Sequence, residues 1–403
     1  MKILIYSANY FPEPTGIGKY SGEMAEWLSE QGHEVRVVCA PPYYPNWDLP
    51  EQYRKVRYWQ EDHGKVRVHR APLWVPKQPG GLKRILHLLT FAASSFPLMM
   101  RQAAWRPDVV FTVAPAFVCA PAGWLTARLS GAKAWLHIQD FEVDVAFQMG
   151  LLKGQLAKSV VLWLESKMLR RFDVVSSISE RMLEKLNDKH VRSERIKFFP
   201  NWVDISKISP ITHASPYKQE LDIPSHAKVA LFSGSLGNKQ GLMVIPAAAE
   251  RLKHREDLYF VICGDGVMKA EIQAATKDLK NVKLLPLQPF ERLNDLLGLA
   301  DVHLLPQSPE AEDLVLPSKL SGMLASGRPV IATCRENTEI AKVVSQCGIV
   351  VAPEDDAQLA NALEQLISAG YPILEQGLVA RKQAEERLSA EFILQRFVAT
   401  AQS

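Results

Sequence analysis

The sequence lacks the features that mark membrane-spanning, disulfide-linked and nucleic-acid-binding proteins. No apolar run reaches the ~18 residues that a membrane-spanning helix requires. The five cysteines are scattered and show no CxxC spacing, so we expect reduced core thiols rather than a disulfide framework. The net charge of +3 and the absence of a long basic run argue against a nucleic-acid partner.

A signal peptide is also not expected, because an apolar strand begins by Ile3 and leaves no room for one. We therefore expect a cytoplasmic protein. At 403 residues the chain is longer than one core usually supports, and its apolar fraction of 47% is sufficient for two cores. We therefore expect two domains.

The most informative motif is KVALFSGSLGNKQGLMVIPAAA, residues 228–249, which predicts a strand, a glycine-rich turn and a helix. The turn contains Gly234, Gly237 and Gly241, and Lys239 stands where the helix should start. Glycines allow close backbone approach, helix-start N–H groups point outward and the ammonium adds a positive charge. The motif predicts a phosphate or diphosphate site, although an ordinary strand–turn–helix corner would also use glycines.

A second such unit opens the chain. Residues 2–38 predict a strand, a loop with Gly16, Gly18 and Gly22, a helix and a second strand. Two openings of this kind predict two doubly wound α/β domains, which bind ligands at the carboxyl ends of their strands. A nicotinamide-dinucleotide domain would need an acidic residue about 20 positions after the glycine loop. Residues 38–41 read VCAP, so that alternative is disfavoured.

Apolar runs that alternate with helical segments predict two mostly parallel sheets. We expect strands at 2–8, 34–39, 66–70, 108–113, 133–138, 173–177, 195–199, 228–233, 258–263, 282–285, 301–305, 329–333 and 348–351. The first domain should span 1–204, the second 205–383, and a final helix 384–403 should follow. The long loop 40–62, rich in proline and aromatic residues, has the length typical of functional loops.

Two segments combine apolar residues with flanking cations. Residues 82–106 fit an interfacial helix that meets anionic headgroups, and they fit equally well a buried helix of the first domain. The flanking cations are Lys83, Arg84, Arg101 and Arg106. For residues 151–171 we favour a plain amphipathic surface helix.

Five further motifs follow in a specific order: SISE at 177–180, FPNWVD at 199–204, CGDG at 263–266, ADVHLLP at 300–306, and PSK at 317–319 continuing to ASGRPV. This order resembles the glycosyltransferases of family 4 with the GT-B fold, over essentially the whole chain. The stretches NYFPEPTGIGKYSGEMAEWL, APPYYPNW, LHIQDFEVD, FFPNW and LPSKL resemble the colanic-acid (exopolysaccharide) biosynthesis group.

The resemblance implies two Rossmann-like domains that face each other across a cleft, with the final helix returning to the first domain. It implies a retaining transfer from a nucleotide sugar, GDP-fucose or a UDP-hexose, to a lipid-linked or oligosaccharide acceptor during exopolysaccharide assembly. The donor would lie on the second domain and the acceptor mainly on the first. We expect no metal, since the sequence shows no DxD pair at a strand end and no His/Cys cluster with ligand spacing.

Fixed positive groups would stabilise the leaving diphosphate. By resemblance, Lys239 contacts the donor phosphates. Ser318 and Lys319 start a helix, so their N–H groups, hydroxyl and ammonium could hold the same diphosphate. The alternative for both lysines is a solvated surface position.

Several glycine and backbone positions complete the predicted site. Gly16 and Gly18 would let the first-domain loop approach the phosphates, and Gly234 and Gly264 belong to the donor loops; tight turns alone would also explain them. Recognition of the base is expected from backbone groups near Leu285 to Gln288, with Leu285 and Leu287 as the candidates.

One family motif, Glu-x7-Glu, is absent. Its two positions are occupied by Leu314 and Gly322, which cannot hydrogen-bond a ribose through side chains. Glu310, Glu312 and Asp313 are candidate replacements. A solvated acidic loop, with backbone N–H groups serving the ribose, is the alternative.

The first domain also departs from the family, which often has a His-Asp pair after a central strand. Here the dipeptide is Gln139-Asp140, and His137 lies on the same strand face two residues earlier. Asp140, with Glu142 nearby, is a candidate to orient the acceptor hydroxyl. His137 is either catalytic or a satisfied core histidine.

Two other functions fit the same fold. One is a sugar-nucleotide epimerase, which needs no acceptor. The other is a catalytically silent sugar-nucleotide-binding partner, which the missing glutamates make conceivable. Product analysis with a nucleotide sugar alone separates these possibilities from transfer.

Overall fold

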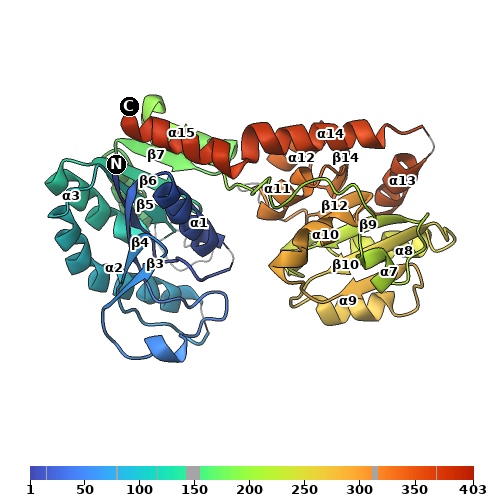
Figure 1. Ribbon diagram of the computed structural model, residues 1–403, viewed down its shortest axis with the longest axis horizontal. Helices are drawn as coiled ribbons and strands as arrows, with labels where there is room; N and C mark the ends of the chain where they lie inside the picture. Colours follow the sequence, from blue (N-terminus) through green and yellow to red (C-terminus); the bar gives the residue numbers. More distant parts are fainter. Residues whose placement is uncertain (15, 79, 116, 142–154, 311–315, 369) are drawn as a thin grey trace. The chain divides into compact units, whose positions relative to one another are not determined.

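The computed structural model describes residues 1–14, 16–78, 80–115, 117–141, 155–310, 316–368 and 370–403, and only the backbone of 155–158 and 239 (Figure 1). The chain forms two compact units. Unit 1 comprises Met1–Pro200 and Leu394–Ser403, and unit 2 comprises Asn201–Ile393. Each unit is an α/β layer structure around its own sheet, which confirms the predicted fold class.

The sheet of unit 1 has the strand order β3-β4-β2-β1-β5-β6-β7-β8. All neighbouring strands are parallel except β3 and β4. The strands are β1 (Lys2–Tyr6), β2 (Glu34–Cys39), β3 (Trp59–His63), β4 (Val66–Arg70), β5 (Val109–Ala114), β6 (Lys133–Ile138), β7 (Val174–Ser177) and β8 (Ile196–Phe198). β3 was not predicted, because this half-exposed edge strand is polar and is held by pairing with β4.

The helices of unit 1 cover both faces of this sheet. They are α1 (Gly16–Glu30), α2 (Gly81–Ala103), α3 (Ala120–Ser130), α5 (Gln155–Leu169), α6 (Glu180–Asp188) and the last helix α15 (Ala390–Gln402), with single turns η1 (Glu51–Tyr53), η2 (Phe117–Cys119) and η3 (Ser193–Arg195). The connection from β1 to β2 moves toward the β3 edge of the sheet. The connections through α2, α3 and α5 move toward the β8 edge. Right-handed crossovers therefore place α1 on one face and α2, α3 and α5 on the other. Figure 1 shows α1 on one side of the sheet and α2 and α3 on the other.

Helix α2 combines features of both predicted alternatives. One side packs into unit 1 and buries Phe91 and Met99 among others. The opposite side exposes large apolar side chains, namely Leu82, Leu86, Leu89 and Phe96. Helix α5 likewise exposes Val160, Trp163 and Leu164, so its apolar side chains are not all turned inward as in the predicted amphipathic surface helix. In the described ranges, every helix falls short of the length and apolarity needed to cross a bilayer.

The sheet of unit 2 is entirely parallel, with the order β11-β10-β9-β12-β13-β14. The strands are β9 (Lys228–Ser233), β10 (Leu258–Cys263), β11 (Val282–Leu285), β12 (Val302–Pro306), β13 (Val330–Thr333) and β14 (Gly348–Val351). The helices are α7 (Tyr217–Glu220), α8 (Val244–Arg251), α9 (Lys269–Thr276), α10 (Leu293–Gly298), α11 (Ser318–Ala325), α12 (Glu339–Val344), α13 (Asp356–Ile367) and α14 (Ile373–Gln383), with the 3₁₀ turns η4 (Asn238–Gln240) and η5 (Phe290–Arg292) and the π-helical turn η6 (Ala384–Leu388).

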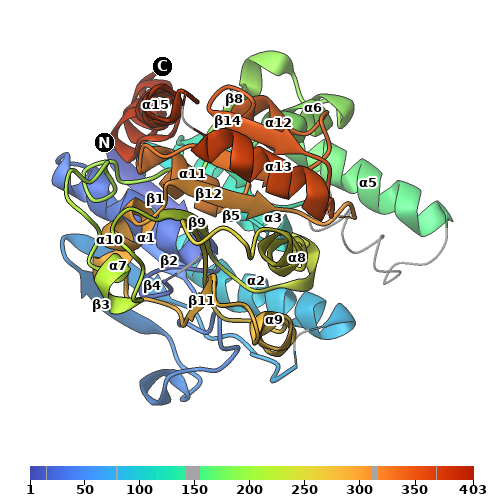
Figure 2. The same ribbon diagram turned by 90° about the vertical axis from the view of Figure 1, so that its right-hand side faces the viewer.

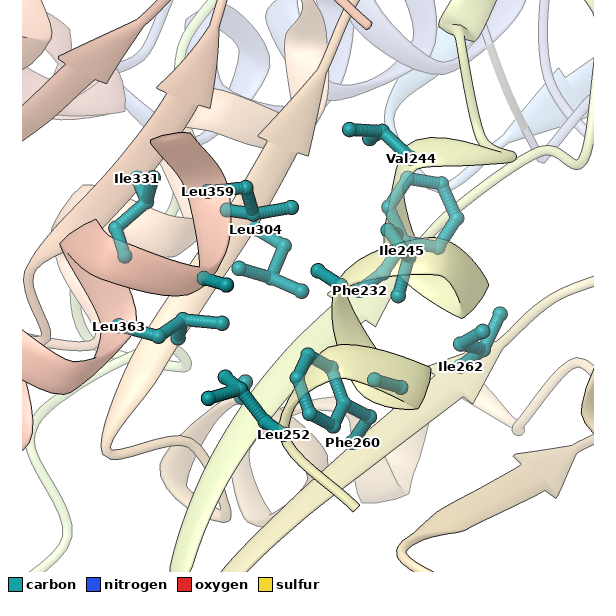
Figure 3. Packing of buried hydrophobic residues seen from close by; sticks show 14 of the residues in the cluster. Phe232, Val244, Ile245, Leu252, Phe260, Ile262, Leu304, Ile331, Leu359 and Leu363 are labelled. Carbon is teal, nitrogen blue, oxygen red and sulfur yellow. The ribbon is translucent and has the colours of Figure 1, made fainter. Parts of the chain in front are cut away.

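A large apolar core fixes the central strands of unit 2. Helices α8 and α13 pack side by side over one face of the sheet (Figure 2). Figure 3 shows their buried side chains meeting those of the strands, including Phe232 of β9 and Leu304 of β12. Each buried side chain of this size contributes roughly 1.5–3 kcal/mol of transfer free energy. The loops that follow β9 and β12 therefore start from rigidly held ends.

Candidate functional site

The carboxyl ends of β9 and β12 form the switch point of unit 2. From β9 the chain builds β10 and β11 toward one edge, and β12, β13 and β14 extend toward the other edge. Open parallel sheets bind ligands where the direction reverses, outside the carboxyl ends of the strands. The predicted phosphate loop follows β9 directly, so the fold puts it at this position.

Three glycines bring two backbone turns into direct contact at this site. A Cβ on Gly264 would lie 1.9 Å from the carbonyl oxygen of Gly234, and one on Gly266 would lie 2.5 Å from that of Leu236. The amide of Gly234 donates to the carbonyl of Cys263 at 3.0 Å, and the amide of Leu236 donates to that of Asp265 at 2.9 Å. The predicted glycines Gly234 and Gly264 therefore allow the loop after β9 to pack on the turn after β10.

The predicted helix start at Lys239 is a short 3₁₀ turn, η4, and α8 begins only at Val244. Gly241 separates them with φ of +58°, and its Cβ position lies 3.0 Å from the backbone of Gln307 and Ser308. This loop thus also contacts the segment after β12. The side chain of Lys239 lies outside the described atoms.

Helix α11 adds an N-terminus that has no side-chain cap among the residues the structure describes. Ser318 is its first residue, and the preceding Pro317 makes no side-chain capping hydrogen bond. The first N–H groups of a helix favour an anion when no side chain covers them. Both predicted residues, Ser318 and Lys319, belong to this first turn.

The side chain of Lys319 reaches back over the end of β9. Its Cδ lies 3.3 Å from the Cβ position of Gly234, and its ammonium lies 4.3 Å from the ring centroid of Phe232. The ammonium donates to the amide oxygen of Gln240 at 2.7 Å. Burial lowers the pKa of Lys319 to about 7. The structure therefore brings Gly234, Gly264 and Lys319 together, and it adds Gln240, which the sequence analysis missed.

The predicted base-binding segment follows β11. The amide of Gly264 donates to the carbonyl of Leu285 at 3.1 Å, and Leu287 is 72% exposed. The side-chain amide of Gln288 is already engaged, since it donates to Pro286 and accepts from the hydroxyl of Tyr217. Backbone groups and the apolar side chain of Leu287 are the surfaces that this segment offers.

Not all predicted ribose candidates can be located. Glu312 and Asp313, like Leu314, lie outside the described residues. Glu310 is exposed, and its amide donates to the hydroxyl of Ser308 at 3.4 Å. Gly322 lies against α10, where the nearest atom to its Cβ position is Leu297 Cδ1 at 3.4 Å.

In unit 1, the glycine loop is organised by a carboxylate that the sequence analysis missed. Glu13 is 3% exposed and accepts hydrogen bonds from the amides of Tyr43 and Tyr44 and from the side chain of Asn9. A Cβ on Gly18 would lie 2.6 Å from Glu13. Gly18 therefore makes room for Glu13, whereas Gly16 opens α1 with φ of +60° and no atom within 4 Å of its Cβ position.

A buried arginine joins the same loops. Arg70, at the end of β4, donates to the carbonyls of Phe11 at 2.7 Å and Ala40 at 2.8 Å, and it pairs with Glu61. The loops after β1 and β2 are thus held by charge-assisted hydrogen bonds. The signal in the sequence was a single arginine at the end of an apolar strand, which is too weak to identify this role.

The structure favours the core alternative for His137. It is 3% exposed, and its ring packs on Phe111 and Phe199. Its Nδ1 lies 3.0 Å from the hydroxyl of Ser176, and burial lowers the pKa of His137 to about 3, so the ring is neutral. Asp140 is half-buried two residues beyond the end of β6, and Glu142 lies outside the described residues.

Within the described part of the chain, His, Cys, Asp and Glu side chains form no group of three or more that could hold a metal ion.

Comparison with known proteins decides the family. Residues 15–202 match the glycosyl transferase 4-like domain, and residues 227–369 match the glycosyl transferases group 1 domain. A protein of Escherichia coli K12 named for colanic acid biosynthesis, the glycosyl transferase WcaI, is 43% identical over 99% of both chains. This chain belongs to glycosyltransferase family 4.

Solved structures of low sequence identity share the fold of this family 4 glycosyltransferase. Sucrose-phosphate synthase from Thermosynechococcus elongatus is similar with a TM-score of 0.72 at 17% identity, covering 100% of this chain and 98% of that one. The Anabaena protein HepE in complex with UDP-glucose is similar with a TM-score of 0.66 at 16% identity, covering 100% and 99%. These similarities show the GT-B fold.

Proposed function

We propose that this glycosyltransferase moves a sugar, with retention, from a nucleotide-sugar donor to a lipid-linked or oligosaccharide acceptor in exopolysaccharide assembly of the colanic-acid type. The observation that carries the proposal is the convergence of the glycine loop after β9, the N-terminus of α11 and Lys319 at the switch point of unit 2. A positive group and the first N–H groups of a helix at one point fit a diphosphate.

The chemistry needs stabilisation of the leaving nucleoside diphosphate as the sugar develops oxocarbenium character. Lys319, Lys239 and the first turn of α11 would supply fixed positive charge to that leaving group. In a front-face route the leaving phosphate accepts the proton of the acceptor hydroxyl, so no second carboxylate is required. In unit 1, Asp140 would orient the acceptor hydroxyl, and Gly16 and Gly18 would carry the loop that approaches the phosphates.

For the donor we propose a UDP-hexose or GDP-fucose. The UDP-glucose complex of HepE supports the former, and the WcaI name supports a role in colanic acid assembly. A thermal-shift screen with UDP, GDP, dTDP and ADP would identify the base. A bound nucleotide at a hundredfold excess over its Kd stabilises the native state by about 2.7 kcal/mol.

We further propose that α2 lies on the anionic cytoplasmic face of the membrane, with the acceptor lipid. Its apolar stripe is exposed, and between Ala71 and Gln139 the only acidic residue is Asp108. Helix α1, on the opposite face of the sheet, exposes Glu26 and Glu30 instead. Apolar insertion combined with cations is the chemistry of an interfacial helix.

The central experiment is Lys239→Ala, assayed for sugar transfer with the nucleotide identified by the screen. Loss of one fixed charge at the leaving group should lower kcat about 10²–10³-fold. The matched control Lys253→Ala removes a surface lysine that pairs with Glu250 at the end of α8, and it should keep full activity.

Full activity of a folded Lys239→Ala variant would reject the assignment. Circular dichroism and thermal unfolding check the fold. Product analysis without acceptor separates transfer from epimerisation, and nucleotide binding without turnover would favour a silent partner.

A further inference from the structure

Gln240 lies in the loop after β9, at the predicted phosphate site. It is the last residue of η4, adjacent to Lys239, and its amide oxygen accepts from the Lys319 ammonium at 2.7 Å. This contact links two segments that are far apart in sequence, the loop after β9 and the first turn of α11. It therefore closes the site across the end of β9.

The surroundings of the Lys319 ammonium explain why it needs this partner. One side is covered by the ring of Phe232, and the stem passes Gly234, where only a hydrogen fits comfortably. A partly buried ammonium without an acceptor would lose the hydrogen bonds it makes in water. Gln240 supplies one neutral oxygen, whereas a phosphate would supply charged ones.

We propose that Gln240 is a positioning residue whose amide oxygen holds the Lys319 ammonium in the place of a donor phosphate oxygen, until the donor displaces it. The inference rests on the proposed function and deepens it. Before the donor arrives, the lysine is kept pointed into the site instead of folding away. When the donor binds, a charge-assisted bond to phosphate replaces the bond to the amide.

Proton uptake follows from the same arrangement. Burial alone accounts for the lowered pKa of Lys319, about 7, and no described carboxylate contributes to it. Among the described atoms, the groups recorded against the Lys319 side chain are the neutral Gln240, Phe232 and Gly234. A bound diphosphate raises the pKa of the ammonium again.

Well below pH 7 Lys319 is already protonated and donor affinity is constant. Above pH 7 the donor must bring a proton to the site, so Kd rises up to about tenfold per pH unit. At pH 8 about 0.9 proton should be taken up per donor bound. The diphosphate of a nucleotide sugar does not itself titrate in this range.

The test is isothermal titration of UDP-glucose and of GDP-fucose between pH 6 and pH 9, in buffers of different ionisation enthalpy. Gln240→Glu should raise the midpoint of the Kd–pH curve, because a carboxylate favours the charged lysine. Gln240→Ala should lower the midpoint, because the charged form loses its hydrogen bond. Lys319→Arg should abolish the dependence, since arginine stays protonated.

The matched control is Gln365→Glu, which adds the same charge on the exposed side of α13. It should leave the midpoint at the wild-type value. Thermal unfolding verifies that each variant folds.

Midpoint shifts in opposite directions for the two Gln240 variants would support the inference, because a merely structural role would not produce them. Unchanged midpoints in an enzyme that binds and transfers would overturn the inference while leaving the proposed function intact. Failure of the wild-type protein to bind either nucleotide sugar would overturn both.

Discussion

At the scale of single residues, glycines act here by making space. Gly264 leaves room for the carbonyl oxygen of Gly234, and Gly18 leaves room for the buried carboxylate of Glu13. Neither glycine needs to touch a ligand to matter. Their immediate role is to bring loops from different strands into contact, and that contact shapes the surface available to a diphosphate.

Because these glycines act by making space, alanine should destabilise the protein more at one glycine of unit 2 than at another. Gly264→Ala places a methyl group 1.9 Å from a carbonyl oxygen, so the turn must move, and we expect a loss of about 1–3 kcal/mol in the free energy of unfolding. Gly237→Ala meets only the hydroxyl of Ser235 at 3.8 Å and should change stability by no more than about 0.5 kcal/mol. Denaturant unfolding measures both, and equal stabilities would contradict the spatial argument.

At this scale, the sequence identified some residues of the site and missed others. Lys319 could be identified because it starts a helix in a motif with a known resemblance. Its partner Gln240 could not, because a neutral residue in a loop carries no signal and the contact spans 79 positions. Glu13 and Arg70 were missed for a similar reason, since burial reverses the usual expectation that charged residues are solvated.

At the scale of helices and strands, apolar patterning was the reliable guide. The central strands are buried on both sides, so their apolar runs stand out, and predicted and observed strands overlap in both sheets. β3 was not predicted because it is paired along one edge only and because its sequence, WQEDH, is mostly polar. For α2, the sequence left two alternatives because buried and lipid-facing helices are equally apolar.

Helix α2 provides a test at this scale. Leu86→Ser combined with Leu89→Ser removes two exposed apolar groups and should weaken binding to vesicles of 30% anionic lipid at least about tenfold, as measured by co-sedimentation. The control Leu374→Ser with Leu378→Ser removes two still more exposed leucines from α14 of unit 2 and should bind as the wild type does.

Salt distinguishes the two contributions to this binding. Raising the ionic strength should weaken the attraction of the flanking cations without affecting apolar insertion. Wild-type protein that does not bind anionic vesicles at low salt would rule out the interfacial role of α2.

At the scale of the whole molecule, the chain leaves unit 1 after Pro200 and supplies the last part of that unit only at Leu394. Phe397 of α15 is buried against Trp135, with ring centroids 4.6 Å apart, and Lys133 donates to the carbonyl of Thr400 at 2.9 Å. Unit 1 is therefore built from two segments that lie at opposite ends of the sequence.

A large-to-small substitution tests how much the packing of α15 contributes to the stability of unit 1. Phe397→Ala should lower the free energy of unfolding of unit 1 by about 3–5 kcal/mol, because it empties a buried site. Phe392→Ala, on the same helix but 39% exposed, should have a clearly smaller effect. Denaturant unfolding followed by tryptophan fluorescence, with and without nucleotide, assigns each transition, and equal effects of the two substitutions would contradict the packing argument.

The late position of Leu394–Ser403 also has a consequence for biosynthesis. Domains usually fold as they leave the ribosome, N-terminal domain first. Here the sheet of unit 1 emerges early, yet the side chain that covers Trp135 is translated only after all of unit 2. A nascent chain that has not yet reached Leu394, or one truncated before it, would carry an exposed aromatic cluster that chaperones and proteases can recognise. Unit 1 is therefore complete only after unit 2 has been fully translated.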